Sequence, residues 1–375
     1  MKITDIQFHL CEARYSNWQF VEMHTDAGIT GVGEATVEGQ ALTVQGRLEE
    51  MGRYLLGKDP REIALHTRNL MRDPFWAGGY VSGSALAGLE MAMWDISGKA
   101  LGVPVWRLWG GCIRERVRVY ANGWFAGAET PEEWGDLAAE VVELGYTAMK
   151  FDPFGKSGPR ISREELGRAQ AIVREVRRGA GPRTDLLIEV HGRFDVHASI
   201  MAARAVEPFD CFWYEEPIAP GNHKALKTLA EAIGIPVATG ERVYSRQDAR
   251  ELLELGAAAV LQVDVCHCGG LEEIRKVAAM AETYSVAIAP HNPNGPVATA
   301  ACLAVDAVMP NFMIQEMMTP WDVEWRDEVV VGSPVVKDGY LEVPNRPGLG
   351  VELVHSELAK HPFEEKSMQM FDNKD

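Results

Sequence analysis

The sequence contains no run of about 18 apolar residues, the length that a membrane-spanning helix needs, and its first residues lack the apolar core of a signal peptide. Its six cysteines are scattered along 375 residues, unlike the closely spaced cysteines of a disulfide framework. Positive charge is also scarce, with 37 Lys and Arg against 54 Asp and Glu and a formal net charge of −17. These features predict a cytoplasmic protein whose thiols stay reduced.

The excess of negative charge argues against two common classes of partner. An acidic surface repels nucleic-acid phosphates and anionic lipid, so we expect neither nucleic acid nor a membrane to bind. An anionic small molecule would need a locally positive site, supplied by cationic side chains or by a metal ion. The length of the chain allows two or three domains.

Hydrophobic patterning divides the chain into three parts. Residues 1–115 begin with alternating strand patterns and continue with helical spacing, which predicts an α+β domain. Residues 116–325 alternate short apolar or β-branched runs with helix-sized segments, which predicts parallel βα units. Eight such runs favour a (β/α)₈ TIM barrel over a doubly wound open sheet. Residues 326–375 return to strand and turn signals, and we expect them to rejoin the N-terminal domain.

Ionisable residues stand at the ends of six successive predicted strands. They are Glu189, Glu215, Glu241, Asp264, His291 and Glu316. The carboxyl ends of the strands surround the catalytic site of a TIM barrel, so we expect these side chains to meet there. A single acidic residue after a strand could be an ordinary helix N-cap, but six in phase favour a common site.

Three of these carboxylates, Glu189, Glu215 and Glu241, come from neighbouring strands and would repel one another without a cation. Mg²⁺ prefers oxygen ligands and keeps open positions for water or substrate. We therefore predict one Mg²⁺ per active site. Zn²⁺ is disfavoured because no set of thiolates and histidines converges at the same place, and the two cysteines that flank His267 are a weaker alternative cluster.

The strand ends also supply two imidazoles. His291 follows the strand beside that of Asp264, and a neighbouring carboxylate raises the basicity of an imidazole, as a general base requires. His191 shares a strand face with Glu189 by parity and could protonate a leaving β-hydroxyl. By the same parity, Asp152 points where Lys150 points. Metal, base and acid together predict removal of the proton α to a substrate carboxylate, followed by loss of water.

The sequence resembles the enolase superfamily, in its mandelate racemase/muconate lactonising enzyme branch, over essentially its whole length. The motifs that carry the resemblance are GLEMAMWDISGKALGVPVWRLWGG, AMKFD, EVHGR, YEEP, GERVYSR, LQVDVCHCGG, APHNPNGP, IQE and KDGYLEVPNRPGLGVE. The combination of EVHGR, GERVYSR and APHNPNGP is most similar to galactonate dehydratase and related acid-sugar dehydratases. The resemblance implies a TIM barrel with a modified last unit, capped by an α+β domain that both chain ends build.

The resemblance also implies roles for individual residues. The metal ligands would be Glu189, Glu215 and Glu241, with the His291–Asp264 dyad as base and His191 as acid. Glu316 would hydrogen-bond near the substrate carboxylate, and Lys150 would place a positive charge there. Capping loops around residues 15–20 and 75–82 would close over the substrate. Their aromatic side chains, including Trp18 and Tyr80, would either contact the substrate or simply pack.

Two positions depart from the pattern of the family. Racemases of this branch carry a second lysine where this chain has Asp152, which argues against a two-base racemase; Asp152 could instead contact a distal sugar hydroxyl. Galactonate dehydratases have Asp where this chain has Glu189, so the resemblance does not fix the sugar.

The leading hypothesis is a Mg²⁺-dependent dehydratase, a hydro-lyase that converts an aldonate such as galactonate to a 2-keto-3-deoxy acid. The alternative is an epimerase, racemase or cycloisomerase that uses the same metal-stabilised enediolate without losing water. A non-catalytic binding protein is a third class, which the complete set of carboxylates, base and acid disfavours. By analogy with the fold, we expect a homo-oligomer with an even number of subunits, such as an octamer.

Overall fold

The N-terminal part of the chain folds around a small antiparallel sheet. The structure is a computed structural model that describes residues 1–72, 75–76 and 78–366. The sheet has the order β1-β2-β3, from strands β1 (Ile3–Glu12), β2 (Asn17–Thr25) and β3 (Thr30–Glu34). Side chains alternate between its two faces, so Val21 and Met23 point to one side, where they pack with helices α1 (Ala41–Leu55), α2 (Ile63–Thr67) and α3 (Tyr80–Leu101).

A parallel sheet makes up the second part, as the alternation of strands and helices predicts. Its strand order is β10-β9-β8-β7-β6-β5-β4-β11. The strands are β4 (Arg116–Ala121), β5 (Ala148–Phe151), β6 (Asp185–Glu189), β7 (Cys211–Glu215), β8 (Val237–Thr239), β9 (Val260–Leu261), β10 (Ala287–Ile288) and β11 (Gln315–Met317). A parallel bridge between Ile288 and Phe312 brings the two ends of this order together, so the sheet closes into a barrel.

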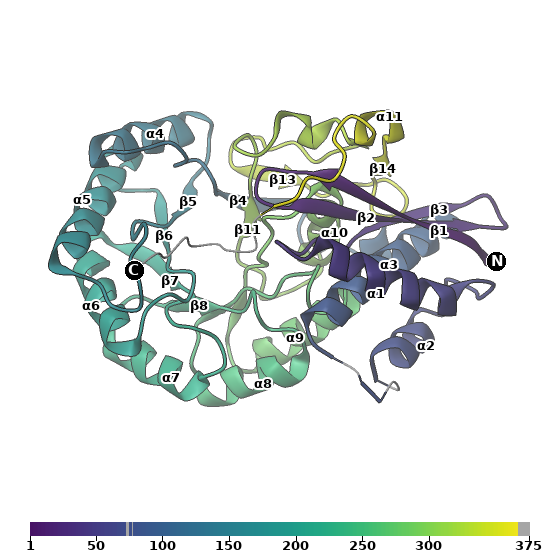
Figure 1. Ribbon diagram of the computed structural model, residues 1–375, viewed down its shortest axis with the longest axis horizontal. Helices are drawn as coiled ribbons and strands as arrows, with labels where there is room; N and C mark the ends of the chain where they lie inside the picture. The colour runs from purple at the N-terminus through teal and green to yellow at the C-terminus, as the bar shows by residue number, and fades with distance from the viewer. Residues whose placement is uncertain (73–74, 77, 367–375) are drawn as a thin grey trace.

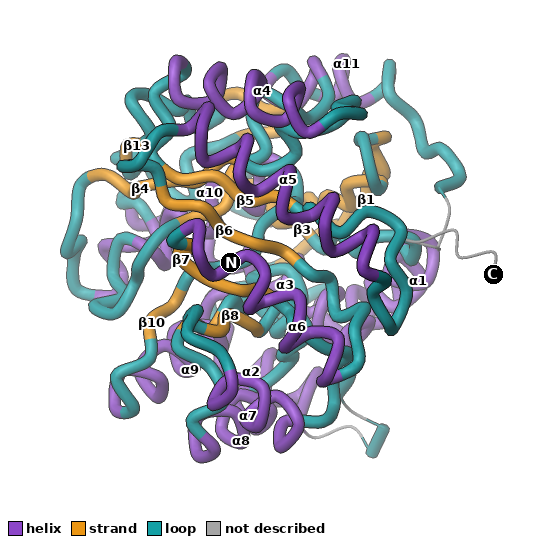
Figure 2. Tube along the Cα trace, turned by 90° about the vertical axis from the view of Figure 1, so that its left-hand side faces the viewer, coloured by secondary structure: helices purple, strands orange, loops and turns teal. Residues whose placement is uncertain are grey.

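Helices surround this barrel, as the tube in Figure 2 shows for the strands inside and the helices at the periphery. They are α4 (Pro131–Glu143), α5 (Arg163–Ala180), α6 (Val196–Val206), α7 (His223–Ala232), α8 (Arg246–Leu255), α9 (Leu271–Thr283) and α10 (Pro296–Asp306). Figure 1 shows α4 to α9 following one another around the outside of the barrel. The predicted TIM barrel is therefore confirmed.

Strand parity determines which side chains fill the barrel. Leu187 and Trp213 belong to a buried cluster inside it, whereas Leu186 and Tyr214, one position away, pack in the cluster that contains the outer helices. Glu189 and Glu215 lie two residues after Leu187 and Trp213, so they share the inward direction. The apolar layer thus forms the floor beneath the carboxylates.

The C-terminal segment contacts both parts of the molecule. Strand β13 (Tyr340–Glu342) pairs antiparallel with the barrel strand β4, which the sequence did not predict. Strands β12 (Val330–Val331) and β14 (Glu352–Leu353) pair with each other, and helix α11 (His355–Leu358) lies against β1. Figure 1 shows this yellow segment beside the N-terminal sheet, so both ends of the chain build the cap. Among the described residues, no helix is long and apolar enough to span a membrane.

A buried carboxylate joins the cap helix to the C-terminal segment. Asp95 on α3 is fully buried and accepts hydrogen bonds from the backbone N–H groups of Val32, at 2.9 Å, and Leu349, at 2.7 Å. Lys99 Nζ lies 2.7 Å from the same carboxylate. Burial raises the pKa of Asp95 to about 6, although these contacts oppose the shift.

We expect Asp95→Ala to destabilise the protein by about 3 kcal/mol, because it leaves the two buried N–H groups of Val32 and Leu349 without an acceptor and removes the buried carboxylate that pairs with Lys99. Urea denaturation followed by circular dichroism measures the change. Asp136→Ala, which removes an exposed partner of Arg178, is the control and should shift stability by less than about 0.5 kcal/mol. Equal effects of the two substitutions would contradict this role of Asp95.

Candidate active site

Three carboxylates converge above the floor of the barrel. Glu189 and Glu215 are the last residues of β6 and β7, and Glu241 follows β8 by two residues. Their ligand oxygens all lie within 4.8 Å of one another. Burial raises the pKa of Glu189 to about 7, and burial together with the charge of Glu189 raises that of Glu215 to about 8. This carboxylate trio therefore holds more negative charge than its surroundings neutralise.

The trio fits a hard divalent cation. All three donors are oxygens, the atoms that Mg²⁺ prefers. Oε2 of Glu189 is buried and accepts no hydrogen bond from any residue that the structure describes. A buried carboxylate oxygen that accepts no hydrogen bond is costly, and a cation bound between the three side chains would reduce that cost.

Lys150, which lies on β5 beside β6, supplies the positive charge next to the trio. Its Nζ lies 2.7 Å from Oε1 of Glu215, 2.8 Å from Oε1 of Glu316 and 3.5 Å from Oε2 of Glu189. Burial lowers the pKa of Lys150, but the surrounding carboxylates outweigh burial and raise it well above its usual value. Lys150 is therefore a cation at neutral pH.

The carboxylate of Glu316 on β11 makes more contacts within the protein than the resemblance implies. In addition to Lys150, its Oε1 accepts a hydrogen bond from Nδ2 of Asn122 at 2.7 Å, and its Oε2 accepts one from the backbone N–H of Asn292 at 2.8 Å. Burial raises the pKa of Glu316, but Lys150 and His291 outweigh it, and the net shift is downward. The anion Glu316 thus positions Lys150 and the loop after β10.

His291 lies in that loop and pairs with Asp264, as predicted from the sequence. Its Nδ1 is 2.8 Å from Oδ2 of Asp264, and its Nε2 is 3.4 Å from Oε2 of Glu241. Burial lowers the pKa of His291, but Glu241, the hydrogen bond with Asp264 and Glu316 outweigh burial and raise it to about 10. Asp264 orients the imidazole and leaves Nε2 directed toward the trio.

The cap holds the loop of His291 in place. Glu34, at the end of β3, is fully buried and accepts hydrogen bonds from the backbone N–H groups of Gly295, at 2.6 Å, and Ala298, at 2.8 Å. These groups lie at the start of α10, where a carboxylate is favoured by the helix dipole. Asn294 in the same loop donates a hydrogen bond from Nδ2 to Oδ2 of Asp264 at 2.9 Å.

His191 reaches the site by a route that strand parity does not describe. Strand β6 ends at Glu189, and His191 has a left-handed backbone with φ of 55°. The parity argument from Glu189 to His191 is therefore wrong, because the chain has left the strand. Nδ1 of His191 lies 2.7 Å from Oδ2 of Asp152. Asp152 thus holds His191 as Asp264 holds His291.

Asp152 itself follows β5 directly, and the same carboxylate is paired with Arg193. It is therefore engaged by His191 and Arg193, and its predicted contact with a distal sugar hydroxyl remains untested. The left-handed turn after β6 brings His191 and Arg193 to one carboxylate. Nothing in the strand pattern of the sequence indicates this turn.

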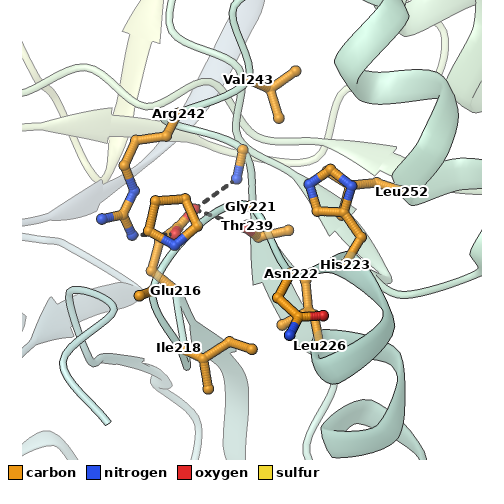
Figure 3. A pocket seen from close by; sticks show the side chains of 13 residues that line it. Glu216, Ile218, Gly221, Asn222, His223, Leu226, Thr239, Arg242, Val243 and Leu252 are labelled. Carbon is orange, nitrogen blue, oxygen red and sulfur yellow. Dashed lines mark hydrogen bonds and ion pairs between the residues drawn. The ribbon is translucent and has the colours of Figure 1, made fainter. Parts of the chain in front are cut away.

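The second glutamate of the Glu-Glu-Pro motif has a structural task. Glu216 has φ of 42°, and its Oε1 accepts hydrogen bonds from Oγ1 of Thr239 at 2.7 Å and from the backbone N–H of Gly240 at 2.9 Å. Figure 3 shows Glu216 pointing toward Thr239 and Arg242. Glu216 also forms an ion pair with Arg242. Glu216 therefore ties the end of β7 to the end of β8, while Glu215 faces the trio.

The two aromatic side chains predicted to contact the substrate or to pack lie in a strand and a helix rather than in loops. Trp18 belongs to β2 and is 1% exposed in the hydrophobic core, where the guanidinium carbon of Arg326 lies 5.6 Å from its ring centroid. A side chain buried to this extent packs in the core, which is one of the two roles that the resemblance leaves open. Tyr80 starts α3, and its hydroxyl pairs with Gln40. Residue 77 of the predicted second loop lies outside the described residues.

Glu38 is a candidate site residue that sequence reasoning missed. It follows β3 in the cap, and its side chain is exposed to solvent. The charges of Glu241 and His291 both act on the Glu38 carboxylate, in opposite directions. The cap thus contributes a carboxylate near the mouth of the barrel. No periodicity or motif in the sequence marks this loop residue.

Comparison with known proteins places the chain in a family. Residues 6–110 match the N-terminal domain of mandelate racemase/muconate lactonizing enzyme, and residues 133–357 match the enolase C-terminal domain-like family. A D-galactonate dehydratase from Pectobacterium atrosepticum is 36% identical over 94% of this chain and 92% of its own length. A D-gluconate dehydratase from Thermoproteus tenax is 36% identical over 94% of this chain and 71% of its own length.

Solved structures agree with this placement. The mandelate racemase/muconate lactonizing enzyme-like protein from a Roseovarius species superposes with a TM-score of 0.93 at 33% identity, over 100% of this chain and 99% of the other. The mandelate racemase/muconate lactonizing enzyme from a Jannaschia species gives a TM-score of 0.91 at 31% identity, over 97% of this chain and 98% of the other. The chain therefore belongs to the mandelate racemase/muconate lactonizing enzyme family of the enolase superfamily.

Proposed function

We propose that the protein is a Mg²⁺-dependent dehydratase of an acid sugar, an aldonate such as galactonate. The observation that carries the proposal is the pair of imidazole–carboxylate dyads, His291–Asp264 and His191–Asp152, on two sides of one carboxylate trio. His291 follows β10 and His191 follows β6, and these strands lie four positions apart in a closed ring of eight among the described strands. Two proton-transfer groups thus approach a bound substrate from opposite sides.

The trio and Lys150 would bind and orient the carboxylate end of the substrate. A Mg²⁺ ion held by Glu189, Glu215 and Glu241 would supply the positive charge that stabilises the substrate carboxylate as negative charge develops on it. The Lys150 ammonium adds charge on the same side and is held there by Glu316. Because the barrel floor is apolar, these charges act in a region of low dielectric, where they are most effective.

His291 is the proposed base. Nδ1–H of His291 donates to Asp264, which leaves the lone pair of Nε2 to take the proton from the carbon α to the substrate carboxylate. A Mg²⁺ ion bound to the trio would offset the negative charge of Glu241, which is one of the causes that raise the pKa of His291. The pKa would then fall from about 10 toward the range in which an imidazole acts as a base.

His191 is the proposed acid. Its Nδ1 is held by Asp152, so the proton on Nε2 can pass to the β-hydroxyl as the C–O bond breaks and water departs. The enol that remains rearranges to a 2-keto-3-deoxy acid. An epimerase or cycloisomerase is the alternative. Epimerisation would return a proton to the α-carbon and leave the β-hydroxyl in place.

Replacement of the two imidazoles should have different effects on dehydration and on exchange of the α-proton. We expect His291→Asn to abolish both dehydration and exchange of the α-proton in D₂O, because no base remains. His191→Asn should lower dehydration by about 10²–10⁴-fold while the α-proton still exchanges. Proton NMR of an aldonate that the wild type converts measures both rates. Retention of α-proton exchange by His291→Asn would remove His291 as the base.

Asp152 should act through His191. We expect Asp152→Asn to lower kcat for dehydration by about 10–100-fold with little change in KM, because His191 loses the carboxylate that orients it. Asp195→Asn, an N-cap substitution at α6, is the matched control and should leave both unchanged. A change confined to KM would instead favour a sugar contact by Asp152.

Removal of divalent cations tests the trio. Treatment with a chelator should abolish dehydration, and added Mg²⁺ should restore it in the wild type. Glu215→Gln should bind Mg²⁺ at least about tenfold more weakly, because one of three anionic ligands is lost. Equilibrium dialysis measures binding without reference to activity. Full activity after chelation, with no Mg²⁺ bound, would contradict the proposed cofactor.

A further inference from the structure

A second cluster of ligand-type side chains lies on the cap, separate from the barrel. It contains His9 on β1, Glu22 and His24 on β2, and His355 at the start of α11. The register of β1 and β2 pairs Gln7 with Glu22, His9 with Phe20 and Asp5 with His24, so the side chains of His9, Glu22 and His24 share one face of the sheet. The C-terminal segment brings His355 to the same face.

The imidazoles are centred on one carboxylate oxygen. Nε2 of His9 lies 3.2 Å from Oε2 of Glu22, and Nε2 of His355 lies 3.3 Å from it. Ligand atoms about 2.0–2.1 Å from a tetrahedral Zn²⁺ are about 3.3–3.4 Å apart, so these separations match the edge of such a site. Ligand atoms of His9, Glu22 and His355 all lie within 4.8 Å of one another.

His24 gives an independent indication of a ligand. Its Nδ1 pairs with Oγ1 of Thr30 at 3.0 Å, as the outer hydrogen bond of a metal-bound histidine does. Its Nε2 is buried, lies 3.8 Å from Oε2 of Glu22 and makes no hydrogen bond with any of the described residues. Buried polar nitrogens normally have a partner. We therefore expect a ligand that Glu22 also binds, such as a metal ion, to lie near Nε2 of His24.

We propose that His9, Glu22 and His355 bind one transition-metal ion of the Zn²⁺ class. Two imidazole nitrogens and one carboxylate oxygen suit such an ion, whereas the all-oxygen trio of the barrel suits Mg²⁺. The Glu22 side chain is only 9% exposed, and its Oε2 lies within 3.3 Å of both imidazole nitrogens, so the three ligand atoms already face one position. The ion would link the first two strands of the cap to the C-terminal segment.

Titration with Co²⁺ under saturating Mg²⁺ tests the site, because Mg²⁺ fills the trio and competes poorly for imidazole. We expect one equivalent of Co²⁺ per chain, with the visible absorption of a four-coordinate ion. His355→Gln, at a side chain 58% exposed, should fold normally and weaken Co²⁺ binding at least tenfold. His9→Gln should also weaken Co²⁺ binding at least tenfold. Zn²⁺ should raise the unfolding temperature of the wild type but not of His355→Gln.

Two controls separate this site from other histidines and from the trio. His223→Gln removes an imidazole that pairs with Glu251 away from the cluster, and it should leave Co²⁺ binding unchanged. Glu189→Gln damages the trio and should also leave the Co²⁺ absorption intact. An unchanged Co²⁺ spectrum and affinity in the double variant His9→Gln/His355→Gln would overturn the proposal. Failure of the wild type to bind Co²⁺ beyond the trio would overturn it as well.

Discussion

Buried negative charge at the mouth of the barrel is the constraint on which the rest of the active site depends. Glu189, Glu215 and Glu316 are buried around one ammonium, that of Lys150. Removing a carboxylate from water costs several kcal/mol unless charge and hydrogen bonds compensate. One lysine cannot compensate all of them, and the raised pKa values of Glu189 and Glu215 are the consequence. The same field raises the pKa of His291, so charge on the trio and proton transfer at the imidazole are coupled.

Cap and barrel act as one unit around this charge. Glu34 from the cap fixes the start of α10, and the loop before α10 carries His291. Arg326 continues the connection, because it donates to the backbone oxygen of Asn294 and its guanidinium lies over the ring of Trp18. Packing deep in the cap therefore supports the geometry of the base. Substitutions far from the trio can change proton transfer by moving this loop.

The sequence predicts the parts of the site that follow from strand periodicity. Glu189 and Glu215 end regular strands, so the alternation of side chains and the closure of the barrel bring them together. Prediction fails where the chain leaves the strand. The left-handed backbone at His191 and the pairing of β13 with β4 depend on tertiary contacts that no local pattern encodes. The resemblance places Trp18 in a capping loop and leaves open whether it contacts the substrate or packs, whereas β2 buries it in the core.

Proton NMR of the wild-type protein with Mg²⁺ and a panel of aldonates in D₂O tests directly whether the protein is an aldonate dehydratase. We expect at least one aldonate to lose water and give a 2-keto-3-deoxy acid with deuterium at C3. Exchange or inversion at the α-carbon without loss of water would contradict it and favour an epimerase. An absence of any reaction across the panel, with Mg²⁺ bound to the trio, would contradict the assignment to aldonates.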